Sequence, residues 1–419
     1  MAQDVLRFVV IGAGLIGPRH AKSVSKRKDC TLFAIVDRSA NGPGVAASCN
    51  CLHFKNVDEM LDFCHKFQVD LPDAAIIATP NHTHAEIGMQ LAAHGIHLLV
   101  EKPMASSAED CVSLLEFCNQ RNVKLLIGHH RRFNPYIITT KANMERIGRP
   151  IAIQGVWALQ KHQAYFDEKQ WRRSVLSGGG ALLTNLIHDL DLLLYLISPI
   201  ERVYAELMPR QRHAEGPDNE VDEGAVLTIK FANGCCGTFL CSDNVTSPFS
   251  FEAGTGENPL VPHHESTAGF YRVFGSKGTI SVPDMTLYHQ HSLPDGQGSW
   301  WRPIEVEHIK MTHGASSYEA PNDSMLTPSS SFDPKVPCSN SSLSNGNVNG
   351  QPEPFDLQLD HFVNLIFGRE KEVKCSGLDA VRALLCIEAV VKSIKTGMPQ
   401  TVELVSNVKP NSELSARFS

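Results

Sequence analysis

Two ionisable side chains stand where they could transfer a proton. Lys102 follows Glu101 at the end of the apolar run 96–100, and His188 lies in the stretch 178–191, which begins with three glycines. The charge of a lysine at a strand end would stabilise an alkoxide that forms on a substrate hydroxyl. Histidine titrates near neutral pH and is the commonest general base. Both residues are therefore candidates for proton transfer at a hydroxyl or carbonyl oxygen.

Each of these residues also has a purely structural interpretation. A lone histidine on a helix is more often a core or interface residue than a base. Thr184, His188 and Asp191 are spaced i, i+4 and i+7, so on a regular helix they share one polar face. That polar stripe favours a functional role for His188.

A glycine-rich turn near the N-terminus indicates a bound dinucleotide. The apolar run 9–11 leads into Gly12-Ala13-Gly14-Leu15-Ile16-Gly17, a G-x-G-x-x-G sequence. The first glycine permits the tight turn, the second lets the backbone approach a pyrophosphate, and the third lets helix and strand pack closely. The helix N-terminus then faces the phosphates with unpaired N–H groups. A glycine turn in an α/β domain without a nucleotide is the structural alternative.

Asp37 bears on which dinucleotide is bound. It follows Gly17 by twenty residues, at the end of a second apolar run. An acid at this place accepts hydrogen bonds from the ribose hydroxyls, which is the context that confirms the glycine motif. Its charge would repel a 2′-phosphate, so the sequence predicts NAD. Arg38 could contact such a phosphate and keeps NADP open as the weaker alternative.

Polar residues also follow the apolar run 74–78, in Thr79-Pro80-Asn81-His82-Thr83-His84. Ligands of open parallel sheets bind outside the carboxyl ends of the strands, so this loop is expected to contact the cofactor. A polar loop with a helix cap is the alternative. The full set of predicted cofactor-binding residues is Gly12, Gly14, Leu15, Ile16, Gly17, Asp37, Arg38, Thr79, Pro80, Asn81, His82, His84, Glu101, Lys102 and Arg131.

The elements that would position these residues form two patterns. Up to residue 128, strands alternate with helices, which predicts a parallel sheet built from βαβ units. The strands are predicted at 6–11, 31–37, 73–79, 96–101 and 123–128, and the helices at 16–27, 57–67, 83–94 and 106–120. After about residue 150, a helix at 180–196 and several strands predict an α+β domain with a mostly antiparallel sheet. Those strands are 151–159, 203–207, 225–231, 236–241, 269–274 and 278–282.

The chain is long enough for two domains. We expect an NAD-binding α/β domain at 1–135, an α+β substrate and oligomerisation domain at 136–405, and a tail at 406–419. Residues 313–353 include a stretch rich in Ser, Asn, Pro and Gly, which predicts a flexible insertion. Helical spacing returns at 355–367 and 377–396, so the C-terminal part is expected to pack back on the folded body.

Composition excludes several classes of function. The net charge is −7 without a basic run, which argues against a nucleic-acid partner. No apolar run reaches the roughly eighteen residues of a membrane span, and the N-terminus lacks signal-peptide features, so a cytoplasmic protein is expected. The twelve cysteines contain no C-x-x-C pair, and the nineteen histidines lack metal-ligand spacing. We therefore expect reduced thiols and no metal.

Five motifs occur together in a fixed order. They are GAGLIG, ATPNHTH, EKP, GHHRRFNP and GGGALLTNLIHDLD. In this order and spacing the chain resembles the glucose–fructose oxidoreductase / inositol dehydrogenase / MocA (Gfo/Idh/MocA) family over about residues 5–310 and 354–405. The resemblance implies a Rossmann domain and a second domain with a large open-faced sheet that assembles homodimers or homotetramers. It also implies hydride transfer between a nicotinamide and a hydroxyl-bearing carbon of a sugar, polyol or cyclitol, with Lys102 and His188 as catalytic residues.

One position departs from the family pattern. Many members carry an aspartate four residues before the histidine, where this chain has Thr184 followed by Asn185. Neither side chain takes a proton at neutral pH, although either could orient a substrate hydroxyl. Tyr165, Trp171 and Arg172 precede the glycine run and would suit a hydroxylated ring, including an acidic one. Two alternatives to a net dehydrogenase stay open: an enzyme that recycles its NAD within one catalytic cycle, and a non-enzymatic NAD-binding regulatory protein.

Overall fold

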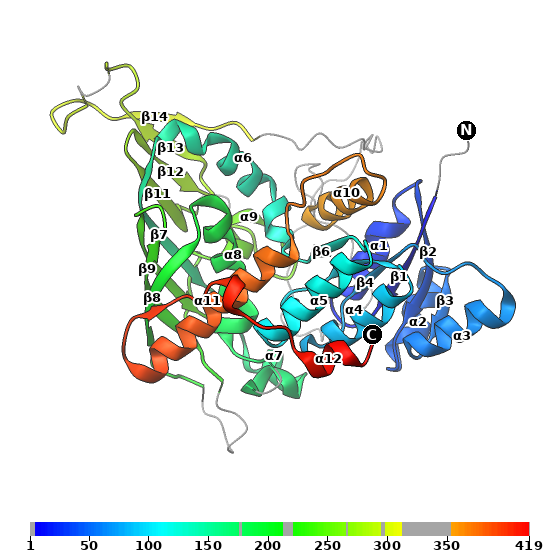
Figure 1. Cartoon of the computed structure of the whole chain (residues 1–419). Helices are drawn as coiled ribbons and strands as arrows, with labels where there is room; N and C mark the ends of the chain where they lie inside the picture. Colours follow the sequence, from blue (N-terminus) through cyan, green and yellow to red (C-terminus); the bar gives the residue numbers. More distant parts are fainter. Residues whose placement is uncertain are drawn as a thin grey trace, which may run out of the picture.

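Two β-sheets organise the protein (Figure 1). The computed structural model describes residues 5–175, 178–212, 221–264, 267–294, 298–311 and 353–418. The predicted insertion at 313–353 lies outside the described residues, apart from Glu353, which directly precedes a helix.

The first sheet has six parallel strands in the order β3-β2-β1-β4-β5-β6. The strands are β1 (Leu6–Ile11), β2 (Cys30–Val36), β3 (Leu52–Phe54), β4 (Ala74–Ile77), β5 (His97–Val100) and β6 (Leu125–Ile127). Alternate residues of β1 enter different cores, because Val9 and Ile11 join one buried cluster and Phe8 and Val10 join the other. Burial on both faces explains the continuous apolar runs. The predicted parallel α/β architecture is confirmed.

The helices of this half largely follow the predicted pattern. They are α1 (Gly17–Ser25), α2 (Asn41–Ser48), α3 (Val57–Phe67), α4 (His84–Ala93), α5 (Ala108–Gln120) and α6 (Pro135–Asn143). The sequence analysis does not predict α2, α6 or β3. Helix α2 contains Gly42, Pro43 and Gly44, which weaken a helical pattern, and β3 has only three residues.

The second sheet has nine strands in the order β14-β13-β12-β11-β7-β10-β9-β8-β15, and only β7 and β10 pair in parallel. Its strands are β7 (Pro150–Ala158), β8 (Ile200–Leu207), β9 (Gly224–Phe231), β10 (Cys236–Ser242), β11 (Tyr271–Gly275), β12 (Gly278–Val282), β13 (Thr286–His289), β14 (Glu305–His308) and β15 (Gln400–Thr401). Helix α11 packs on one face of this sheet at β8. The predicted, mostly antiparallel second sheet is confirmed, with three additional short strands at its edges.

The helix predicted at 180–196 is not uniform. Its first part is a π-helical turn, Leu182–Leu186, and α8 (Ile187–Leu196) follows. The carboxylate of Asp222 accepts a hydrogen bond from the Leu182 amide at 2.9 Å and so caps the turn. A π-turn inserts extra residues into the helical repeat, so the i, i+4, i+7 polar stripe is broken. Asp191 accordingly bonds to Arg132 instead of continuing a surface with Thr184.

Three C-terminal helices return to the first half of the chain. Helix α10 (Pro354–Ile366) packs on α1, and α11 (Gly377–Thr396) packs on both α5 and α8. Helix α11 begins with a capping box at Ser376 and ends at Gly397, whose φ is +63°. The tail predicted at 406–419 contains α12 (Ser412–Ala416), which lies against α5. The expectation that the C-terminal part packs back is confirmed.

A buried ion pair ties these parts together. Arg132, in the segment after β6, donates to both carboxylate oxygens of Asp191 on α8, at 2.8 and 2.6 Å. It also donates to the backbone oxygen of Lys374, which precedes α11, at 2.7 Å. Both charged side chains are almost fully buried. One guanidinium therefore fixes α8 and α11 relative to the parallel sheet.

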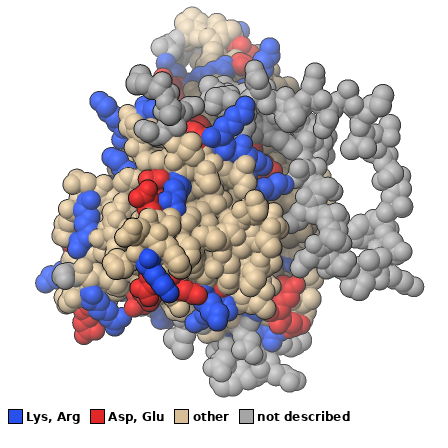
Figure 2. Space-filling view, turned by 90° about the vertical axis from the view of Figure 1, so that its right-hand side faces the viewer, with Lys and Arg blue, Asp and Glu red and all other residues tan. Residues whose placement is uncertain are grey.

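Charge is spread over the surface that Figure 2 shows. Lys and Arg side chains alternate there with Asp and Glu side chains, and neither sign forms a continuous band. No helix in the described ranges is long and apolar enough to cross a membrane. Within the same ranges, no group of three or more His, Cys, Asp or Glu side chains is arranged to hold a metal ion. The described cysteines carry free thiols.

The Arg132–Asp191 pair predicts a large stability effect. Asp191→Asn keeps the side-chain shape but leaves the guanidinium buried without this opposite charge, so the free energy of unfolding should fall by about 3 kcal/mol. Urea denaturation measures it. The matched control is Glu307→Gln, which breaks the partly exposed pair with Arg146 and should change the stability far less. If both variants lost the same free energy of unfolding, the stabilising role of the Arg132–Asp191 pair would be contradicted.

Candidate active site

The glycine turn is shaped by its own backbone. Gly12 has φ +102°, and a Cβ there would lie 2.5 Å from the Ala78 carbonyl oxygen. A Cβ at Gly17 would lie 1.9 Å from the Gly12 oxygen, whereas one at Gly14 would meet nothing within 4 Å. The first and third glycines are thus required by the fold, and the exposed second leaves room for a ligand.

The residues around this turn fit a dinucleotide. Helix α1 begins at Gly17 without a side-chain cap; Pro18 has no N–H and the Arg19 N–H bonds to the Ile16 oxygen, so the Gly17 N–H is the helical donor that can face a phosphate oxygen. Leu15 is exposed and Ile16 half-buried at the mouth of the turn. Together with the open side of Gly14, these features form the cradle that the motif predicts.

Asp37 is held rigidly beside the turn. One carboxylate oxygen accepts from the Ala13 amide at 2.5 Å, and the other accepts from the Ser39 amide at 2.6 Å. Burial acts to raise the pKa of Asp37, but these hydrogen bonds outweigh it and lower the pKa below its usual value. The carboxylate stays ionised and has lone pairs left for ribose hydroxyls. Arg38 is exposed.

The loop after β4 is joined to the loop after β5. The two ring nitrogens of the buried His84 lie 2.8 Å from the Pro103 and Thr79 carbonyl oxygens. His84 therefore holds the two loops together, a role the sequence does not reveal. Pro80 and His82 are exposed on the same loop. The Asn81 amide lies beside Gly178, where a Cβ would come within 2.9 Å of it.

Lys102 reaches from the parallel sheet to the second half of the chain. Its Nζ donates to the backbone oxygen of Thr184 at 3.0 Å, one turn before His188. Burial lowers the pKa of Lys102 to about 8, with Arg131 and Lys161 acting in the same direction and Glu101 against it. Lys102 is therefore close to its titration point at physiological pH.

Glu101 points to the opposite side of the strand end. Its carboxylate lies 2.8 Å from Nε2 of the buried His20 on α1. A Cβ at Gly128 would come within 2.8 Å of this carboxyl, so that glycine makes room for it. Burial opposes ionisation, but His20 and nearby cations lower the pKa of Glu101 to about 2. Glu101 thus places a fixed negative charge next to Lys102.

His188 is buried near two further histidines. Its ring packs edge-to-face with His130 at 5.4 Å and with His129 at 6.3 Å between centroids. Burial lowers the pKa of His188 well below 6.5, and the charges of Lys102 and Arg131 lower it further. The imidazole is consequently neutral at pH 7, the form that accepts a proton. Its Nδ1 has no hydrogen-bond partner among the described residues.

Arg131 is enclosed by carboxylates from the second half of the chain. It donates to Glu252 at 2.6 Å and to Glu257 at 3.2 Å, and it lies 3.6 Å from Asp189. Asp189 also accepts from the Tyr271 hydroxyl, and burial raises the pKa of Asp189 to about 7. Arg131, predicted as a cofactor contact, is thus committed to ion pairs between the two sheets.

Thr184 and Asn185 make a small polar network. The single Thr184 hydroxyl proton has two acceptors within reach, the Gly180 backbone oxygen at 2.6 Å and the Asn185 side-chain oxygen at 2.8 Å. The same Asn185 oxygen accepts from Lys161 Nζ at 2.6 Å. The sequence prediction missed Lys161. The signal was available, because Lys161 comes two residues after the predicted strand 151–159, and Lys102 likewise follows a strand end.

The remaining predicted substrate residues lie on two short helices. Tyr165 is on α7 (Gln163–Asp167), and Lys161 Nζ lies 4.9 Å above its ring. Arg172 stacks on the same ring at 3.9 Å, and its guanidinium donates to the backbone oxygen of Tyr165 and to the Glu168 carboxylate. Arg172 is thus already paired, whereas Trp171 is partly exposed. Tyr165 thus lies beside Lys161, which bonds to Asn185. Trp171 lies farther out, with its side chain partly exposed.

The whole chain matches one family. Residues 6–129 match the profile of an oxidoreductase family with an NAD-binding Rossmann fold, and residues 141–404 match that family's C-terminal alpha/beta domain. The fold and site define an NAD-binding oxidoreductase. The chain belongs to the Gfo/Idh/MocA family, as the motif order predicts.

Several known proteins are similar to this chain. It is 28% identical over 397 residues to the uncharacterized oxidoreductase YrbE of Bacillus subtilis, covering 94% of this chain and 96% of that protein. It is 29% identical to an inositol 2-dehydrogenase of Rhizobium meliloti, covering 66% of this chain and 75% of that protein. It is 26% identical to a levoglucosan dehydrogenase of Pseudarthrobacter phenanthrenivorans, covering 55% and 66%.

A solved structure shares the fold over the full length. The WlbA dehydrogenase of Bordetella pertussis, crystallised with NADH and UDP-GlcNAcA, superposes with a TM-score of 0.67 at 21% identity. The match covers 96% of this chain and 99% of that one. At this identity the likeness shows the fold alone.

The lowered pKa of Lys102 predicts a pH dependence. If the cation stabilises an alkoxide, kcat/KM for a hydroxyl substrate should fall as pH rises through about 8, where the ammonium loses its proton. Initial rates between pH 6 and 10 measure it. Lys102→Arg, which stays protonated throughout, should be slower but should lack this decline. A wild-type kcat/KM that rises through the same range would show that the neutral amine acts as a base.

Proposed function

We propose that this protein is an NAD-dependent dehydrogenase that oxidises a hydroxyl-bearing carbon of a sugar, polyol or cyclitol. The observation that carries the proposal is the meeting of Lys102 and His188. Lys102 leaves the strand end next to the dinucleotide turn, and its Nζ bonds to the backbone one turn before His188. A cation and a neutral imidazole from the two halves of the chain thus lie near each other.

The proposed mechanism divides the work between these residues. A bound NAD supplies the nicotinamide that accepts hydride. The glycine turn and the N-terminus of α1 would hold its pyrophosphate, and Asp37 would hold the adenosine ribose. Lys102 polarises the reacting oxygen. His188 takes the hydroxyl proton as hydride leaves the same carbon, so the alcohol becomes a carbonyl.

We infer the substrate class from the names of the relatives and from the polar side chains near Lys102. The relatives' names include levoglucosan dehydrogenase, inositol 2-dehydrogenase and glucose-6-phosphate 3-dehydrogenase, all of which act on polyhydroxylated rings. Asn185 and Lys161 offer hydrogen bonds next to Lys102, and Tyr165 offers an apolar ring face. We assign substrate contacts to these three and, at the rim, to Trp171. Thr184 contributes through its backbone oxygen, and Arg172 orients Tyr165.

A second candidate function is internal recycling of the cofactor. One relative, from Escherichia coli, is named 2,7-anhydro-N-acetylneuraminate hydratase and is 23% identical over 280 residues. Hydration involves no net oxidation, so an enzyme of this class would not accumulate NADH. The stoichiometry of NADH per product distinguishes the two functions.

The catalytic pair gives the direct test. A panel of sugars, polyols and cyclitols with NAD and NADP, followed by nicotinamide absorbance, should identify a substrate for the wild type. Lys102→Ala and His188→Ala should each lower turnover by about a hundredfold or more. NAD binding should survive in both variants, because the glycine turn is untouched. The double variant should be less impaired than the product of the single effects. Full activity of His188→Ala would remove it from the mechanism.

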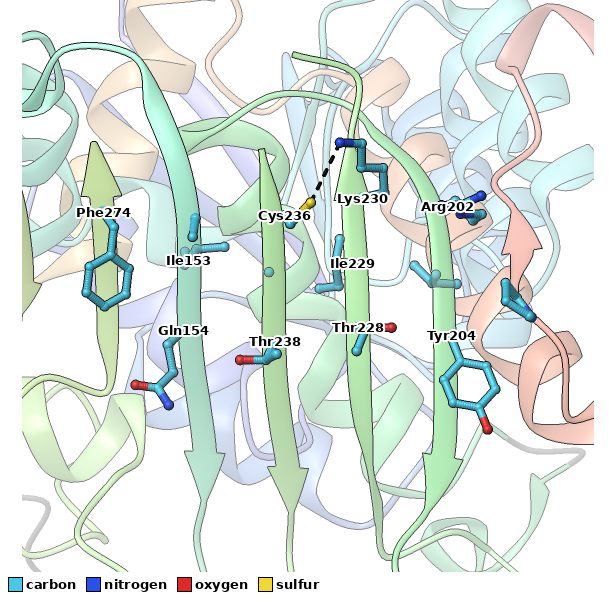
Figure 3. Close-up of a pocket in the computed structure, with 14 residues that line it drawn as sticks. Ile153, Gln154, Arg202, Tyr204, Thr228, Ile229, Lys230, Cys236, Thr238 and Phe274 are labelled. Carbon is cyan, nitrogen blue, oxygen red and sulfur yellow. Dashed lines mark hydrogen bonds between the residues drawn. The ribbon is translucent and has the colours of Figure 1, made fainter. Parts of the chain in front are cut away.

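We also propose that the exposed face of the large sheet assembles homodimers or homotetramers. Gln154, Thr238, Thr228 and Tyr204 form one row of paired residues across four strands, with Phe274 beside it (Figure 3). They line a hollow on this face. Its mixture of ring, methyl and polar groups resembles a protein interface.

The free thiols support a reducing compartment such as the cytoplasm.

The sheet-face proposal predicts a change of mass in solution. Phe274→Glu places a charge on the face and should shift the protein toward monomer in size-exclusion chromatography with light scattering. Phe67→Glu, on the exposed end of α3, is the matched control and should leave the mass unchanged. A monomeric wild type, or an oligomer that tolerates Phe274→Glu, would contradict the interface.

A further inference from the structure

The proposed oxidation leaves a proton inside the protein. This inference rests on the proposed function, because each time the hydroxyl-bearing carbon loses hydride to NAD, its hydroxyl also loses one proton. His188, the acceptor, is only 6% exposed. Burial and nearby cations hold its pKa well below 6.5, so His188 does not retain the proton at neutral pH. The proton needs a route from His188 to solvent.

His130 lies on such a route. Its ring stands edge-to-face against the His188 ring, with centroids 5.4 Å apart. The Nδ1 atoms of both rings are buried and have no hydrogen-bond partner among the described residues. Buried imidazole nitrogens normally have one, so these two are available for proton exchange between the adjacent rings. The His130 side chain is 15% exposed, so it continues outward from His188.

The structure fixes His130 in this position. Its ring stacks on Phe355 of α10 at 4.6 Å, and its Nε2 lies 3.5 Å from the Glu257 carboxylate. Burial opposes ionisation of Glu257, but His130 and Arg131 lower its pKa to about 2. Glu257 therefore remains a carboxylate beside His130 and does not take its proton.

Other charged groups surround His130 on every side. Glu101 faces it from the end of β5, and His188 faces it from α8. On α1, Arg19 lies over the outer face of the Phe355 ring, and His20 contacts the edge of that ring. The neutral Phe355 separates these two residues from His130. The carboxylates of Glu257 and Glu101 thus face His130, and the Arg131 guanidinium bonds to the same Glu257 oxygen that lies nearest His130.

His129 does not offer an equivalent route. It is fully buried, its Nδ1 lies 3.7 Å from Asp191, and Asp191 is committed to Arg132. A proton passed to His129 would have no exposed group to follow. The geometry therefore distinguishes two adjacent histidines that the sequence presents as equivalent.

We propose that His130 is the relay that carries the substrate proton from His188 to solvent. The hydroxyl O–H bond breaks and an N–H bond forms on His188. That proton then passes to His130, which returns His188 to the neutral base. Water or buffer removes the proton from His130, and Glu257 keeps its charge throughout. One proton enters the chain of groups and one leaves it in each turnover.

The test uses His130→Gln in the full-length protein. Glutamine can still donate to Glu257, but it cannot exchange a proton. With a substrate identified from the panel, kcat at low buffer concentration should fall about tenfold or more. KM and the Kd for NAD should stay within about twofold, because no group that holds substrate or cofactor changes. Added imidazole should restore kcat in a concentration-dependent way, an effect that a merely structural role would not produce.

Controls separate the relay from other effects. His94→Gln changes an exposed histidine on the same half of the chain and should leave kcat unchanged. His188→Gln should be slow and should not respond to imidazole, because the first acceptor is missing. If His130→Gln does not fold, His130→Asn replaces it, and its slower turnover should likewise be restored by imidazole.

Two results would overturn the relay. Wild-type turnover of His130→Gln at low buffer, or a loss that imidazole does not restore, would show that the proton leaves by another path while the dehydrogenase function stands. A wild-type protein that produces no NADH with any substrate would instead overturn the proposed function and the relay with it.

Discussion

The site depends on two arginines that follow the parallel sheet and form ion pairs with carboxylates in the second half of the chain. Arg131 and Arg132 leave the parallel sheet directly after β6, and their carboxylate partners lie on α8, on α9 (Phe251–Thr255) and just beyond α9. Removing these charges from water is costly, so the pairs persist only when the two halves of the chain stand in one arrangement. That arrangement brings the Lys102 ammonium to the backbone of Thr184, and it places His188 beside the strand end.

The same charges set the protonation states of the site. Cations around His188, together with its burial, keep the imidazole neutral and able to accept a proton. Burial brings Lys102 close to its titration point, and Glu101, held by His20, opposes that effect. Lys102 and His188 thus have different charges at the same pH because their surroundings differ. The site can therefore supply both a cation and a neutral base.

The departure at Thr184 has a structural consequence. The family resemblance predicts an aspartate at this position, and in this chain the π-helical turn presents the Thr184 backbone oxygen to Lys102. The Thr184 hydroxyl is turned to Gly180 and Asn185 instead. Orientation of Lys102 therefore comes from a carbonyl dipole. A carbonyl cannot exchange protons, so another group must do so, which agrees with the position of His130 between His188 and the surface.

Local patterns in the sequence were enough to predict several features of the fold and of the cofactor site. The glycine turn, the position of Asp37, the alternation of strands and helices and the extent of α11 depend on neighbouring residues, whose conformations and periodicity can be recognised along the chain. Only the tertiary structure decided that Arg131 is paired with carboxylates, that His84 joins two loops, that Lys161 lies beside Asn185, and that the helix before His188 contains a π-turn. Each of these outcomes depends on a partner that is remote in sequence. Burial gives such contacts their strength, and burial exists only once both sheets have packed together.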